Sequence, residues 1–104
     1  MADETNKGTL LEEIKTALRV TSTVYDAEVT ALIEAAKADM RRVGVEETLL
    51  DESAIDPLCK AAVMLYCKAR FGYDNDEAER FDKSYQQMLK DMRNAPTTYG
   101  GDSQ

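Results

Sequence analysis

The chain contains no histidine and no tryptophan, and only two cysteines and two prolines among its 104 residues. Without histidine it lacks the commonest general base and the commonest metal ligand. No apolar run reaches the roughly 18 residues that a membrane-spanning helix needs, and the polar start MADETNKG does not resemble a signal peptide. We therefore expect a chain that does not cross a membrane, and its composition argues against catalysis.

Basic charge is also scarce, because 13 lysines and arginines stand against 20 acidic residues and leave a net charge of −7. This balance argues against a protein whose affinity comes from neutralising many phosphates, or one that a basic patch holds on an anionic membrane. The hydrophobic fraction of 43% is ordinary for a soluble globular protein, and the length suits a single domain.

Apolar residues recur at helical spacing in four segments, which predicts an all-α fold, a small four-helix bundle. The expected helices span residues 10–19, 26–43 and 57–71, with a fourth from a cap at Asp74 or Asn75 to about residue 93. Residues 9–93 are expected to form the folded domain. The polar ends, residues 1–8 and 94–104, are expected to be flexible.

Polar residues at the ends of these segments support the expected bounds. Thr9 and Thr23 each stand three residues before an acidic residue, which is the spacing of a capping box. Asp56 is expected to cap the third helix, whose first turn holds Pro57, and Gly44 to end the second.

The third segment, LCKAAVMLYCKARF, is apolar on nearly every side, so we expect it to be the central helix of the bundle. Lys60 and Lys68 mark its one exposed edge. Cys59 and Cys67 would lie roughly 12 Å apart along a helix, which is too far for a disulfide. They are expected to be buried, reduced thiols.

The longest connection, VEETLLDESAID at residues 45–56, is acidic and has Leu49 and Leu50 at its centre. A loop of about 12 residues is long for a compact bundle, and such loops often carry function. The alternative is that the two leucines simply cover one end of the core.

The basic residues gather in one region of the expected bundle. Lys37, Arg41 and Arg42 would lie on the outer face of the second helix, and Lys60 and Lys68 on the edge of the third. Such a group could contact nucleic acid. Solvated helix faces are the better interpretation, because the net charge is negative and no aromatic residues are interleaved.

No segment carries the pattern of an active site. The acidic cluster at residues 74–79 lacks the glycine and the terminal glutamate of a calcium loop. No glycine-rich phosphate loop is present, and a cysteine nucleophile would lack an activating histidine. We expect no catalytic residues, no cofactor and no metal.

Three segments in order, LLEEIKTALRV, YDAEVTALIEAAKADMRRVGV and DPLCKAAVMLYCKARFGYDNDEAERFDKSYQQMLKDM, carry a family resemblance. Together they resemble the small head–tail connector, or adaptor, proteins of tailed bacteriophages and prophages. The resemblance covers about residues 9–93, and its most specific part is the third segment.

The resemblance implies a non-enzymatic virion protein of the head–tail junction, present in the host cytoplasm before assembly. Such proteins form a closed ring, commonly dodecameric, between the portal and the stopper or tail-completion proteins. DNA would pass through the ring without sequence-specific binding.

A ring needs two different complementary faces on each subunit. We expect the acidic connection to form one face and the basic edge the other, and an aromatic residue in the tail to dock onto a partner. The candidate interface residues are Leu49 and Leu50 in the connection, Lys37, Arg41, Lys60 and Lys68 on the basic edge, and Tyr99 in the tail.

Two other functions are alternatives to the connector. A small helical regulator, or antitoxin-like module, would act as a dimer on a protein or DNA partner and would need a clear basic face. An enzyme based on acids would need two carboxylates in an apolar cleft. The sequence gives little support to either.

Overall fold

The computed structural model describes residues 9–72 and 76–94. Within these ranges it has no strand and four α-helices: α2 (Leu10–Leu18), α3 (Asp26–Arg42), α4 (Pro57–Arg70) and α5 (Ala78–Arg93). The prediction of an all-α four-helix bundle is confirmed. The expected flexible segment 1–8, almost all of the segment 94–104 and the expected caps Asp74 and Asn75 lie outside the described residues.

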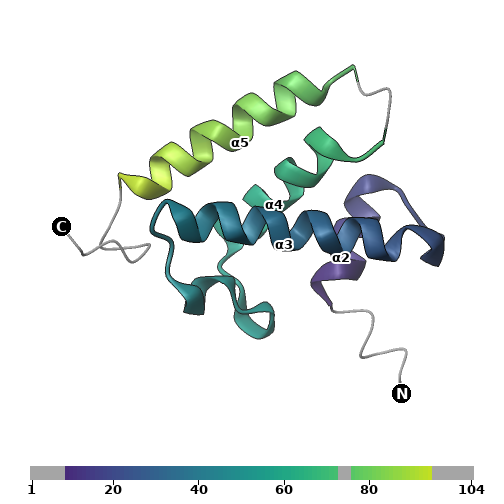
Figure 1. Cartoon of the computed structure of the whole chain (residues 1–104), viewed down its shortest axis with the longest axis horizontal. Coiled ribbons are helices and arrows are strands. Elements are labelled where there is room, and N and C mark those ends of the chain that lie inside the picture. Colours follow the sequence, from purple (N-terminus) through teal and green to yellow (C-terminus); the bar gives the residue numbers. More distant parts are fainter. Residues whose placement is uncertain (1–8, 73–75, 95–104) are drawn as a thin grey trace.

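Helix α4 is the centre of the bundle, because it packs against α2, α3 and α5. Helices α3 and α5 run in the same general direction, so their C-terminal ends lie on the same side of the molecule, at the left of Figure 1. Three short 3-10 helices complete the described chain: η1 (Thr23–Tyr25), η2 (Glu47–Leu50) and η3 (Glu52–Ala54).

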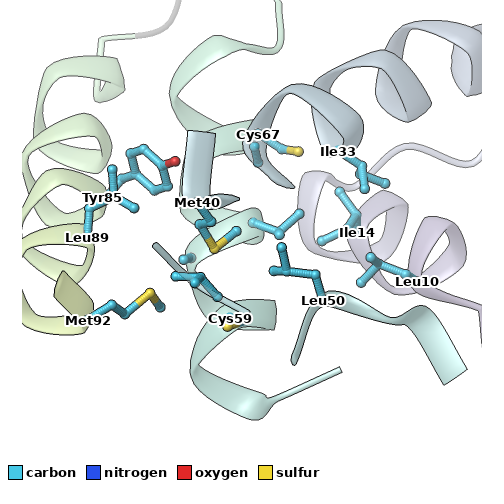
Figure 2. Packing of buried hydrophobic residues seen from close by; sticks show 14 of the residues in the cluster. Leu10, Ile14, Ile33, Met40, Leu50, Cys59, Cys67, Tyr85, Leu89 and Met92 are labelled. Carbon is cyan, nitrogen blue, oxygen red and sulfur yellow. The ribbon is translucent and has the colours of Figure 1, made fainter. Parts of the chain in front are cut away.

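The core takes apolar side chains from all four α-helices and from the connection after α3 (Figure 2). Tyr85, Leu89 and Met92 of α5 lie on one side of the core, and Leu10 and Ile14 of α2 on the other. Burying one such side chain stabilises the fold by about 1.5–3 kcal/mol. The fully or almost fully buried apolar residues are Leu10, Ile14, Val29, Ile33, Ala36, Met40, Val45, Leu50, Cys59, Ala62, Val63, Cys67, Tyr85, Leu89 and Met92.

Three of the expected helix ends are confirmed in detail. The Thr9 hydroxyl accepts a hydrogen bond of 3.1 Å from the Glu12 amide at the start of α2. The Asp56 carboxylate accepts hydrogen bonds from the first amides of α4, beside Pro57. Gly44 follows α3 with a φ of 106°, a left-handed conformation that glycine adopts without strain.

Helix α3 begins at Asp26 as predicted but lacks the expected cap, and α5 begins later than predicted. Tyr25, not Thr23, precedes α3, and no side chain caps this helix. The capping role passes to η1, because its Thr23 carbonyl accepts from the Asp26 amide. Helix α5 begins only at Ala78, so the expected first-turn residues up to Glu77 form a turn before it.

Leu50 is a core residue, as the second interpretation of the connection proposed. Its side chain is 1% exposed and lies among core side chains of α2 and α3 in Figure 2, whereas Leu49 is half-buried. Residues 47–50 therefore close one end of the bundle.

We expect Leu50→Ala to lower the free energy of unfolding by about 2–4 kcal/mol, because it leaves a cavity in the core. Leu49→Ala is the matched control and should cost clearly less. Urea unfolding followed by circular dichroism measures both. Equal, small losses in the two variants would contradict the core position of Leu50.

Candidate functional site

Lys37 does not lie on an outer face, contrary to the sequence-based expectation. Only 5% of this residue is exposed, and its ammonium nitrogen lies 2.7 Å from a carboxylate oxygen of Glu52 and 3.7 Å from one of Glu34. Because the connection after α3 folds back toward this helix, its acidic residues reach Lys37. The lysine therefore joins α3 to η3.

Arg41 makes a second link between α3 and the same connection. Its guanidinium donates two hydrogen bonds to the Glu47 carboxylate, with distances of 2.6 Å and 3.1 Å. These bonds lower the pKa of Glu47 and raise that of Arg41. The acidic connection and the basic residues of α3 therefore pair within one chain, although opposite charges were expected to meet between subunits.

The two lysines of α4 contact other helices. The Lys60 ammonium lies 2.6 Å from a carboxylate oxygen of Glu13 in α2. The Lys68 ammonium lies 5.4 Å from the ring centre of Phe81 in α5, at cation–π distance. The structure thus brings Lys37, Arg41, Leu49 and Leu50 together around the connection, and places Lys60 and Lys68 along α4. Tyr99 lies outside the described residues.

Sequence reasoning missed an ion pair between α2 and the start of α3 in which the lysine is buried. Lys15 is 4% exposed, and its ammonium lies 2.6 Å from a carboxylate oxygen of Asp26, whose side chain is 36% exposed. Removing Asp26 would leave the buried lysine without this partner, which costs more than losing a surface pair. Nothing in the sequence beyond the position of Lys15 next to Ile14 indicates this burial.

It also missed a polar contact in the core between α3 and α5. The Tyr85 hydroxyl donates a hydrogen bond of 2.8 Å to one carboxylate oxygen of Asp39, and Arg42 pairs with the other oxygen. Burial acts to raise the pKa of Asp39, but these two hydrogen bonds outweigh it and hold the pKa below its ordinary value. Burial raises the pKa of Tyr85. Asp39 is therefore ionised at neutral pH and fixes the position of α5.

The two thiols are buried and free, as expected from their spacing. Burial raises the pKa of both Cys59 and Cys67 to about 12. Because only the thiolate reacts readily, both groups are chemically inert near neutral pH.

A groove of about 430 Å³ lies between the C-terminal end of α3 and the outer side of α5. Four cations line it, Arg42, Lys83, Lys90 and Arg93, and we call it the basic groove. Val43 and Leu89 give it an apolar component.

Residues 9–72 and 76–94 hold no group of three or more histidine, cysteine or acidic residues that could bind a metal ion. None of the helices in these ranges is both long enough and apolar enough to span a membrane.

We expect the contribution of Asp39 to stability to disappear in acid. Because its pKa in the folded chain is lowered, its charge stabilises the fold above the unfolded pKa of about 3.9, and this contribution is lost as the pH falls through the lowered value. Asp39→Asn should therefore cost on the order of 1–2 kcal/mol at pH 7 and progressively less below about pH 4.

Urea unfolding of this variant and of wild type at pH 7 and pH 3 measures the effect. The matched control is Asp91→Asn on the exposed side of α5, where a small loss at both pH values is expected. A cost of Asp39→Asn that does not change with pH would contradict the role of its charge.

The fold and its surfaces can be compared with known proteins. Residues 10–97 match the family model described as phage connector protein, a range that includes all four helices. No curated protein and no solved structure matches the chain. The family description indicates a structural component of the virion that assembles with other virion proteins. Because the family model covers most of its length, the chain belongs to the phage connector protein family.

Proposed function

We propose that the chain forms a closed ring at the head–tail junction, between the portal and the stopper or tail-completion proteins. The observation that carries this proposal is the family match, which extends over the whole bundle. The position at the junction and the usual number of twelve subunits come from the resemblance of the three sequence segments to head–tail connectors.

Exposed apolar side chains support a role in assembly. Val24 is 75% exposed, Leu58 49% and Tyr25 43%. Tyr25 of η1 contacts Phe71 just after the last residue of α4, whereas Leu58 lies in the first turn of that helix, so the exposed apolar groups stand at different places. Apolar groups exposed at different places on one subunit suit an assembly with several neighbours.

The charge of the chain supports the passage of DNA through the ring. The net charge is −7, and acidic surfaces do not hold phosphates. Lys37, Arg41 and Lys60 already pair with acidic residues of the same chain, which further reduces the basic charge open to DNA.

We assign the acidic connection to contact with the portal or the stopper. Its exposed acids Glu46 and Asp51 and the half-buried Leu49 lie on a segment that Lys37 and Arg41 hold against α3. A segment fixed in this way is ready to bind without first becoming ordered, which lowers the entropic cost of association. Lys60, Lys68 and Tyr99 are further proposed partner contacts.

The native mass tests the ring. Twelve copies of the 11.6 kDa chain have a mass of about 139 kDa. We expect light scattering of the purified protein, with negative-stain images, to show a species near this mass with a ring outline. A tight dimer whose mass does not change with concentration would contradict the ring and favour a regulatory module.

Deleting residues 95–104 tests the proposed role of the tail. If Tyr99 docks onto a partner, the shortened chain should bind the cognate portal at least tenfold more weakly, a loss of about 1.4 kcal/mol. Surface plasmon resonance on immobilised portal measures the affinity, with Tyr99→Ala in the full chain as the matched variant. Unchanged binding by both variants would contradict the docking role of Tyr99. Retained helix content would confirm that the fold is intact.

A further inference from the structure

We infer that neighbouring copies of this chain contact each other head to tail. In this contact the exposed turn before α3 of one copy sits in the basic groove of the next. We call Val24 and Tyr25 of η1, with Glu28, the apolar turn. The inference rests on the proposed ring and names the two surfaces that would join its subunits.

The apolar turn has the character of an anchor. Val24 is 75% exposed, more than the exposed apolar residues Tyr25 and Leu58. Tyr25 is held in place because its ring stands edge-on against Phe71, with 5.6 Å between the ring centres. An aromatic side chain that is fixed before binding loses little entropy on association, and such residues dominate the affinity of many interfaces.

The apolar turn includes one acidic residue. Glu28 lies one helical turn after Tyr25 and is exposed. In the described part of the chain its carboxylate takes part in no ion pair. It remains available to a cation of another molecule.

The basic groove has the opposite charge and an apolar component. Lys83, Lys90 and Arg93 form no ion pair within residues 9–72 and 76–94, unlike Lys37, Arg41 and Lys60. Asp82, the one acid among the lining residues, already pairs with Arg70. The groove therefore has uncompensated positive charge in a chain whose net charge is −7, beside the apolar Val43 and Leu89.

The two surfaces lie at opposite ends of the bundle. Helix α3 has 17 residues, so its ends are about 24 Å apart, with the apolar turn before the first residue and Arg42 at the last. Because α3 and α5 run in the same general direction (Figure 1), Glu28 in the first turn of α3 lies toward one end of the bundle and Lys90 and Arg93 in the last turn of α5 toward the other. A surface at one end that complements a different surface at the other makes a heterologous contact, which repeats from copy to copy.

Two variants that block one surface each test the contact. Lys90→Glu with Arg93→Glu reverses the charge of the basic groove, and Val24→Ser with Tyr25→Ser removes the apolar side chains of the turn. We expect each variant alone to be monomeric by light scattering under conditions in which wild type assembles. Mixed together they should form only a one-to-one pair of about 23 kDa. The intact apolar turn of the groove variant binds the intact basic groove of the turn variant, and no further copy can add because the other two surfaces are blocked.

The control is Arg80→Glu, set against Lys90→Glu alone, because both change the net charge equally but Arg80 pairs with Glu77 in the same chain and does not line the basic groove. It should assemble like wild type. Circular dichroism melting confirms that every variant is folded.

The outcomes separate this contact from the proposed ring. Assembly that persists in the groove variant, or that is lost equally in the control, would overturn the contact and leave the ring standing. If wild type forms open chains and neither blocking variant does, the contact is supported and the closed ring is overturned. A wild type that stays monomeric at every concentration, with and without portal, would overturn both.

Discussion

The structure depends on the need to cover α4 on nearly every side. Its sequence offers few polar positions, and Cys59, Ala62, Val63 and Cys67 are fully buried. Helices α2, α3 and α5 each pack against it, and Leu50 closes one end of the same core. Because a helix this apolar cannot face water, the positions of the other elements follow largely from the need to shield it.

The parts of the fold that depend on local chemistry were predictable from the sequence. The spacing of apolar residues gave the four helices, and the pair Asp56 and Pro57 gave the start of α4, because capping and proline geometry act within one turn. The first residue of α3 was predicted, but the way in which its first amides are satisfied was not. Thr23 has the right spacing for a cap, but the residues around it form the 3-10 helix η1, whose backbone satisfies the first amides instead.

Less of the candidate site than of the fold could be predicted from the sequence. The sequence identified Lys37 and Arg41 as a basic group and the connection as acidic, but it could not show that the two pair with each other across a fold-back of the chain. Charge patterns give the number and sign of ionic groups, whereas partners such as Tyr85 and Asp39 are set by which helices pack side by side. For the same reason, the sequence did not single out Lys83, Lys90 and Arg93 of α5, which form no ion pair in the part of the chain that the structure describes.

The two buried thiols have a consequence for the life of a virion protein. The cytoplasm in which a phage protein folds is reducing, and the medium that receives the particle is oxidising. Cys59 and Cys67 are fully buried with a pKa of about 12, and they stand eight residues apart on one helix, so they neither react nor bridge. The fold of the chain therefore needs no disulfide between these cysteines on either side of lysis, and the change from a reducing to an oxidising environment does not alter how α4 packs.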